Sequence, residues 1–426
     1  MTPPPAVEAL SPADEIASPL AHLTEQQIEE LAREFDAIHD RVFEDLGERD
    51  RRYIESMIAM HRRLLVVSRV VLLGSHSWPA WAGGTAALSL AKILENMEIG
   101  HNVLHGQWDW MNDPYINSST WDWDTASTSE AWKHSHNYVH HTFTNIRGKD
   151  KDLGYEIMRI DPHQKWNPVY LFQPFYNLLL ASFFEWGVAA HDLDFEAIRT
   201  GTKTKEQIKR ELKGMAGKAR SQIVKDYIAW PLISGLASAA AEAGRSRFAR
   251  KRRWNDVAKE SLERGLQTLR STQKANFAAN MVRNIWSYSI IFCGHFPDQT
   301  YTFSEEEAEG ESRGGWYVRQ LCGAANIEGG PMFHVASGNL GYQVEHHLFP
   351  DMPSTRYAEI APRVKEICER YDLPYNTGPF GQQLGMVQRT ILRLALPGGK
   401  PRPKPGPYRG GDDDLVEASP NGPGPS

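Results

Sequence analysis

Residues 132–145 read WKHSHNYVHHTFTN, a segment with four histidines within eight residues, at His134, His136, His140 and His141. In a helix, residues four apart lie on one face. His136 and His140 have that spacing, and His141 lies beside them. We therefore expect this face to bind a ligand and the fold to be arranged around it.

Two further segments repeat the pattern. EIGHNVLHGQWDW (98–110) places His101 and His105 four residues apart, and GYQVEHHLFP (341–350) contains the adjacent pair His346 and His347. The three segments hold eight of the 16 histidines in the chain.

Imidazole nitrogens are good ligands for Zn, Cu, Fe and Ni, and a second hydrogen bond fixes the ring. A single histidine on an apolar face is usually a hydrogen-bonded core residue. One structural zinc needs only about four ligands, so eight clustered histidines favour two metal ions. The three cysteines, Cys293, Cys322 and Cys368, form no CxxC pair and argue against zinc ribbons, iron–sulfur clusters and disulfides.

The motifs HNVLH (101–105), HNYVHH (136–141) and QVEHHLFP (343–350) resemble the three histidine boxes of the membrane fatty acid desaturase family. The third box, with Gln343 in place of its first histidine, resembles the linoleoyl-type and front-end branch. The similarity extends over about residues 64–375 and includes GHFPD (294–298), where His295 matches an extra histidine of such enzymes.

This resemblance implies an O2-dependent desaturase with two iron ions that removes two hydrogens from a fatty acyl chain. The iron ligands it implies, which are also the expected catalytic residues, are His101, His105, His136, His140, His141, His295, His346 and His347. Gln343 is expected to bind iron directly or through water. His134 and His334 are held in reserve as ligands.

The chain lacks the HPGG motif of a fused cytochrome b5 domain. We therefore expect electrons from a separate protein, either a ferredoxin or rubredoxin with a reductase or a free cytochrome b5. The double-bond position and the acyl carrier, coenzyme A, a carrier protein or a lipid, stay open. Two other functions also stay open: a lipid hydroxylase or ketolase with the same boxes, and a non-catalytic histidine-rich metal-binding protein.

Carboxylates near the boxes are candidates for orienting the ligand histidines, although acids in exposed loops are more common. The candidates are Asp109, Asp122, Asp124, Asp150 and Asp152. Glu345, inside the third box, is a further candidate.

The resemblance implies an all-α, membrane-type bundle of about four spanning helices and additional interfacial helices, with a histidine-rich di-metal cap on the cytoplasmic side. The expected spans are residues 63–74, 82–94, 227–241 and 277–294. Residues 168–190, rich in aromatic side chains, suit an interfacial or substrate-covering helix. The mean hydropathy of −0.49 is that of a soluble protein, and no run reaches about 18 uninterrupted apolar residues. The membrane assignment therefore depends on the resemblance.

The charge and composition of the chain limit its possible functions and indicate its domain organisation. A net charge of −6 excludes a nucleic-acid footprint. Basic residues are concentrated at 203–225 and 245–253. These segments either form solvent-exposed surfaces or contact anionic lipid or an acidic electron donor. We expect one desaturase domain at 24–396, flanked by disordered tails at 1–23 and 397–426. Within the domain, one helix is expected to start at Thr24 and another to cover residues 357–371. The expected location is an integral membrane position with the active site facing the cytoplasm.

Overall fold

The computed structural model describes residues 18–248 and 254–398 of the chain. These residues are predominantly helical, and they include two short strands, β1 (Asn326–Glu328) and β2 (Thr377–Pro379), that pair in parallel. The predictions for residues 1–17, 249–253 and 399–426 lie outside the described residues.

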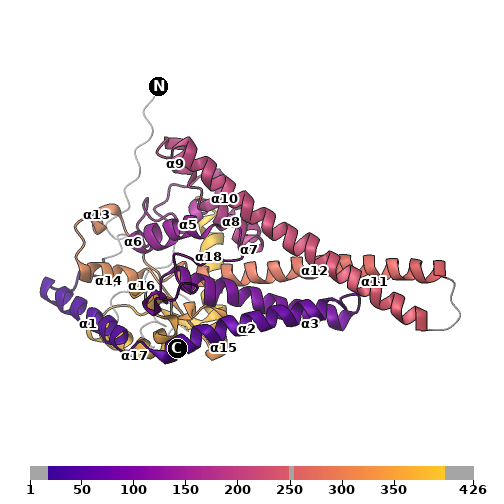
Figure 1. The fold of residues 1–426 in the computed structure, drawn as a ribbon. Coiled ribbons are helices and arrows are strands. Elements are labelled where there is room, and N and C mark those ends of the chain that lie inside the picture. The colour runs from indigo at the N-terminus through magenta and orange to yellow at the C-terminus, as the bar shows by residue number, and fades with distance from the viewer. Residues whose placement is uncertain (1–17, 249–253, 399–426) are drawn as a thin grey trace, which may run out of the picture.

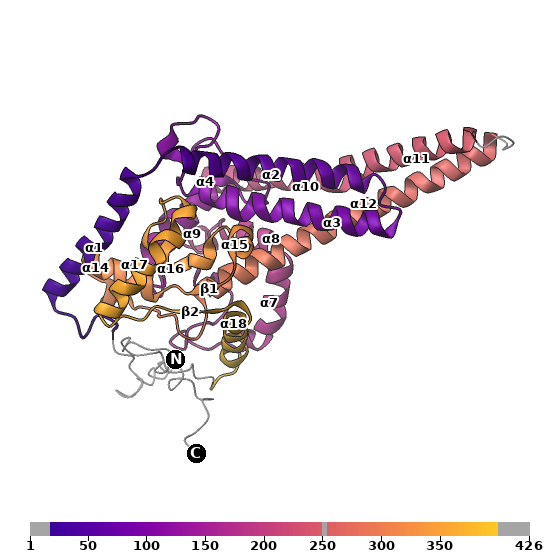
Figure 2. The same cartoon turned by 90° about the horizontal axis from the view of Figure 1, so that it is seen from below.

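Two helical hairpins lie side by side and form an elongated arm (Figures 1 and 2). The first consists of α2 (Glu48–Leu72) and α3 (Trp78–Ile93), and the second of α11 (Trp230–Phe248) and α12 (Trp254–His295). A Cβ atom built on Gly235 would lie 2.9 Å from the carbonyl oxygen of Gly265. The two glycines therefore let α11 and α12 approach with their backbones nearly in contact.

The interior of the arm holds charged side chains beside a small apolar cluster of Leu72, Leu88, Ala275 and Ala279. The fully buried carboxylate of Asp226 accepts hydrogen bonds from Arg69 at 3.0 Å and from Lys92 at 2.8 Å. Asn276 binds both Arg69 and the backbone carbonyl of Asp226. Arg69, which interrupts the first apolar run, thus faces protein and pairs with an acid from the other hairpin.

The prediction of four spanning helices is wrong. The four apolar runs do lie in the hairpins, but none of the helices among the described residues has both the length and the apolar character needed to cross a membrane. The physical reason is visible in α2 and α12, where apolar turns alternate with charged ones, and in the buried ions of the arm. Counting apolar residues along the chain did not reveal that these charges have partners.

At the end of the arm, a compact body surrounds the histidine segments (Figure 1). One side is formed by α1 (Glu25–Glu44), α14 (Arg313–Cys322), α16 (Gln343–Leu348) and α17 (Tyr357–Arg370), which enclose a core containing Phe35, Tyr317 and Phe349. Helix α1 begins with a capping box formed by Thr24 and Gln27, as the sequence predicts. Helix α17 covers the predicted residues to within one position.

The other side of the body comes from the middle of the chain. Its main helices are α7 (Gln173–Ser182), α8 (Phe184–His191), α9 (Phe195–Thr200), α10 (Lys205–Ile223) and α18 (Phe380–Leu394). The helix expected over residues 168–190 is broken at Phe183, whose φ of −121° and ψ of 37° separate α7 from α8. Short helices complete the body: α4 (Asn102–Leu104), α5 (Ser129–Trp132), α6 (His141–Phe143), α13 (Glu305–Ala308) and α15 (Pro331–Ala336).

Two π-helical segments, η1 (Leu94–His101) and η3 (Lys133–His140), carry the first two histidine boxes, and a third, η6 (Val224–Ala229), joins α10 to α11. The i→i+5 hydrogen bonds of a π-helix widen each turn, so residues four and five apart share a face, and such segments are frequent at functional sites. This geometry brings His136, His140 and His141 to the same side. The sequence predicts an ordinary helix here and misses this feature.

The buried ions of the arm give a stability prediction. Asp226→Asn should destabilise the fold by about 3–5 kcal/mol, because Arg69 and Lys92 lose the carboxylate that compensates their burial. Denaturant unfolding followed by circular dichroism would measure it. Glu263→Gln, an exposed acid on α12, should stay within about 0.5 kcal/mol of the unchanged protein. Equal stability of the two variants would contradict this account of the arm.

Candidate metal centre

The structure brings all eight predicted ligand histidines together, seven of them in two groups. The first group is His101, His105, His136 and His346, and the second is His140, His295 and His347; in each group one ligand nitrogen per residue lies within 4.8 Å of the others. The ring of His141 lies between the groups. Its centroid is 4.8 Å from that of His105 and 4.6 Å from that of His347.

These rings converge through nitrogens that bind nothing in the protein. The Nε2 atoms of His101, His105, His136, His140, His346 and His347 and both ring nitrogens of His141 are buried without a hydrogen-bond partner among the described residues. An unpaired buried polar atom costs about 1–3 kcal/mol. Seven histidines with this defect at one point fit a site that binds metal ions.

The opposite ring nitrogens are fixed, which decides the tautomers. Tyr357 donates its hydroxyl hydrogen to the carbonyl of Phe349, so its oxygen accepts from Nδ1 of His346 at 3.1 Å. Gln320 donates to the carbonyl of His141 and accepts from Nδ1 of His347 at 3.0 Å. In both histidines Nδ1 carries the proton, and Nε2 offers its lone pair to the interior of the site.

Two acids perform the same function for the second box. Asp150 accepts from Nδ1 of His140 at 3.1 Å, and Asp152 accepts from Nδ1 of His136 at 3.2 Å. Asp150 is itself held by the backbone N–H groups of Asn145 and Asp152. Such partners orient a ligand histidine and make it a stronger base.

The electrostatics favour neutral imidazoles. Burial lowers the pKa of His101 to about 3, and the nearby His136 acts in the same direction. Burial also holds the pKa of His105, His141 and His347 well below the usual histidine range. For His140, burial is outweighed by Asp150 and Asp152, which raise the pKa. Neutral rings are the form that binds metal.

Gln343 and His295 lie at the edge of the second group. Nε2 of Gln343 is 3.1 Å from Nε2 of His295, and Oε1 of Gln343 has no partner among the described residues. A Cβ atom on Gly294 would lie 2.8 Å from Cδ of Gln343. Glycine at this position therefore leaves room for the amide next to the histidines.

The two reserve histidines lie outside the groups. His134 is exposed and stacks on Tyr138, and His334 stacks on Tyr342 with ring centroids 4.3 Å apart.

The structure divides the candidate acids into those that contact a ligand histidine and those that do not. Asp150 and Asp152 contact ligand histidines, whereas Asp122 and Asp124 bind the lysines of residues 218 and 225 and Asp109 accepts hydrogen bonds from Ser118. Glu345 also orients no histidine, because its partners are Asn326 and Tyr375. Sequence distance to a box does not distinguish these acids.

Sequence reasoning missed Tyr357, Gln320, Asn102 and His191. Asn102 lies next to His101 and accepts from its Nδ1 at 3.1 Å. His191 contacts Asp152 at 3.0 Å. Only Asn102 is close enough in sequence to be suspected, whereas the others come from segments that meet the boxes through the tertiary fold.

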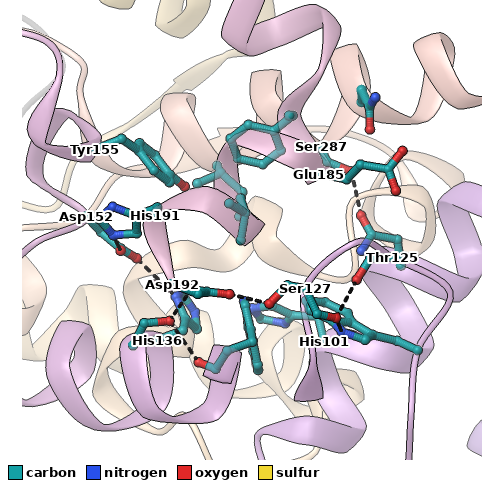
Figure 3. Close-up of a pocket in the computed structure, with 18 of the residues that line it drawn as sticks. His101, Thr125, Ser127, His136, Asp152, Tyr155, Glu185, His191, Asp192 and Ser287 are labelled. Carbon is teal, nitrogen blue, oxygen red and sulfur yellow. Dashed lines mark hydrogen bonds and ion pairs between the residues drawn. The ribbon is translucent and has the colours of Figure 1, made fainter. Parts of the chain in front are cut away.

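A cavity opens beside the first group, with an empty volume of about 690 Å³ that includes some open solvent. Figure 3 shows His101 and His136 on one side of it and Glu185 and Ser287 on the other. Its apolar walls are formed by Met97, Trp123, Trp132, Phe184, Val188 and Ile291. The sequence predicted His101, His136 and Asp152 as site residues, but it indicated none of these apolar wall residues.

Comparisons with known proteins agree with this geometry. The family model described as "Fatty acid desaturase" matches residues 76–244 and 272–379. The chain is 47% identical over 377 residues to the NADPH-dependent stearoyl-CoA 9-desaturase of Mycobacterium tuberculosis, covering 88% of this chain and 82% of that protein. It is 23% identical to the sn-1 linoleoyl-lipid 6-desaturase of Synechocystis sp., over 72% of this chain and 79% of that protein. No solved structure matches significantly.

The orienting acids give a second prediction. Asp152→Asn should weaken metal binding about 10–100-fold, because the amide is a poorer acceptor for Nδ1 of His136. Metal titration of the purified protein with competing chelators would measure the affinity.

The matched control is Asp122→Asn. Asp122 is also close in sequence to the second box, but it contacts no ligand histidine. It should leave metal affinity unchanged. A loss of the same size in both variants would show that Asp152 has no orienting function.

Proposed function

Because the chain belongs to the fatty acid desaturase family, we propose that it introduces a double bond into a fatty acyl chain with O2 and two electrons. The observation that carries this proposal is the convergence of eight histidines, seven with free lone pairs, beside a cavity with apolar walls. The overall reaction consumes one O2, two electrons, two protons and two substrate hydrogens, and it releases two waters.

The two histidine groups would hold two iron ions, with His141 positioned between them. When bound, the irons would supply the oxidant, formed from O2, that removes the two hydrogens. The histidine ligands are all neutral. The negative charge that would partly compensate the charge of the irons comes from Asp150 and Asp152, which bind the far nitrogens of His140 and His136.

The protein itself positions the substrate. The cavity walls bring an acyl chain against His101 and His136, and the indole rings of Trp123 and Trp132 enclose it. Enclosure keeps water away from the reacting carbons, which prevents the oxidant from being quenched.

The finer details follow the relative at 47% identity. We propose an acyl-CoA substrate, a double bond at position 9, and electrons that originate from NADPH, because the printed name of that relative states these properties. The electrons would reach this chain through a separate redox protein, a ferredoxin, a rubredoxin or a cytochrome b5, together with its reductase.

We further propose that the enzyme works at a membrane, on the cytoplasmic side. Exposed apolar side chains gather on three helical surfaces: Val66, Val67 and Val70 of α2; Phe175, Leu178 and Leu179 of α7; and Ile228, Leu232, Ile233 and Leu236 of η6 and α11. Apolar patches of this kind suit contact with lipid. The three cysteines are free and buried, which suits a reducing compartment.

Activity gives the third prediction. Expression in a host with iron and a redox donor should add an unsaturated fatty acid, two hydrogens lighter than its precursor, detected by gas chromatography with mass spectrometry. His140→Ala should return the profile to that of the empty host and lower bound iron, since His140 contributes to the second group. His134→Ala, outside the groups, should keep both.

The same measurement separates the alternatives. A product heavier by one oxygen would indicate a hydroxylase. An unchanged fatty acid profile with about one zinc per chain would indicate a metal-binding protein without this activity.

The cavity gives the fourth prediction. Ile291→Trp should shift the preference from C18 toward C16 acyl-CoA by about tenfold in relative kcat/KM, because a larger side chain shortens the space for the substrate. Ile285→Trp places the same side chain on the exposed surface of α12 and should leave the preference unchanged. Identical selectivity of the two variants would show that this cavity does not hold the acyl chain.

A further inference from the structure

The metal site has a polar connection to a second surface, which His191 and Tyr155 separate from the acyl cavity, since both side chains line the two cavities. Asp152, which holds His136, also accepts a hydrogen bond from Nε2 of His191 at 3.0 Å. His191 ends α8 and is buried, and its Nδ1 lies 3.9 Å from Glu156, whose side chain is one-third exposed. Three side chains thus join a ligand histidine to the protein surface.

His191 forms part of the floor of an open cavity on that surface, here called the outer cavity. The outer cavity is lined by the exposed apolar side chains of Ile157 and Phe195. Three charged residues, Glu156, Glu196 and Arg199, also line it. An apolar centre with a charged rim is the usual composition of a protein–protein contact. Glu156 and Glu196 would repel an anionic lipid layer and an acidic protein alike, so the charge that attracts the partner lies outside the outer cavity.

A row of cations begins directly beyond the outer cavity. Helix α10 starts six residues after Arg199, and Lys203, just before it, binds the carbonyl of Leu193 beside His191. The exposed face of α10 carries Lys205, Lys209, Arg210, Lys213 and Arg220, here called the basic stripe, with Glu206 as an acid on the same face. No ion pair involves the basic stripe within the described residues. The stripe is therefore free to attract an acidic protein.

We propose that the outer cavity and the basic stripe form the docking surface for an acidic one-electron carrier protein, with His191 and Asp152 as the path from that carrier to the metal site. This inference rests on the proposed function, which needs two electrons from a separate protein. His191 is a positioning residue in this scheme, because it reaches the ligands only through Asp152. The reduced carrier loses one electron per encounter, so two encounters supply one turnover.

Binding tests the docking surface directly. The probe is an acidic [2Fe–2S] ferredoxin, titrated against the full-length protein at several salt concentrations. The wild-type protein should bind with an affinity that falls as salt rises. Lys205→Glu combined with Lys209→Glu should raise the Kd about tenfold and remove the salt dependence. The control pair, Lys259→Glu with Arg270→Glu, reverses two exposed charges on α12 and should bind as the wild type does.

Kinetics test the path. With NADPH, ferredoxin reductase and ferredoxin, the stripe variant should show an increased KM for ferredoxin and an unchanged rate when dithionite replaces the carrier. His191→Leu should slow ferredoxin-driven turnover at saturating carrier by a larger factor than dithionite-driven turnover, because any shift of Asp152 affects turnover with both electron donors alike. His191→Gln, which keeps a hydrogen-bond donor for Asp152, should recover part of the loss.

Unchanged ferredoxin affinity in the stripe variant overturns the proposal, as does an absence of ferredoxin binding by the wild type. The proposal is also overturned if the stripe variant loses binding to vesicles with anionic lipid while its affinity for ferredoxin stays that of the wild type. The basic stripe would then be a lipid-binding surface. A wild type that binds ferredoxin but desaturates nothing, even with dithionite, would refute the proposed function and leave the docking result standing.

Discussion

The hydrogen bond behind five of the ligand histidines, His101, His136, His140, His346 and His347, is the constraint on which the rest of the site depends. A metal ligand must present its lone pair in a fixed direction, and an imidazole does so only when its other nitrogen is held. Asp150 and Asp152 come from the loop after the second box, Gln320 from α14 and Tyr357 from α17. Two helices of the body, α14 and α17, and the loop after the second box thus serve the same purpose, since each places a hydrogen-bonding partner behind a ring.

The amino-acid sequence was sufficient to predict which histidines converge, because the spacing of histidines is local information and the resemblance added His295. It was not sufficient to predict the partners of those histidines. Asp124 and Asp152 look alike along the chain, yet one pairs with Lys225 and the other with His136. The difference arises from which segments meet in space. Gln320 and Tyr357 were missed for the same reason.

The spanning helices were mispredicted because the resemblance to a membrane family was given more weight than the polar composition of the chain. Residues 63–74 are apolar around Arg69, and the sequence alone treats that arginine as an obstacle. In the fold, Asp226 and Asn276 make it part of a polar interior shared by two hairpins. The arm thus combines buried ions with exposed apolar surfaces, the reverse of the arrangement in a water-soluble bundle. Both features concern tertiary contacts that no window of sequence contains.

The π-helical form of η3 makes the second box depend on the hydrogen-bond pattern of its backbone in a way that an ordinary helix does not. A π-turn accommodates one more residue than an α-turn. If the segment became α-helical with its length unchanged, the extra residue would turn the residues on its far side by about 100°. His141 would then turn away from His136 and His140 although every histidine was retained. In this part of the molecule, a substitution that restores α-helical hydrogen bonding therefore damages the site without changing a single ligand.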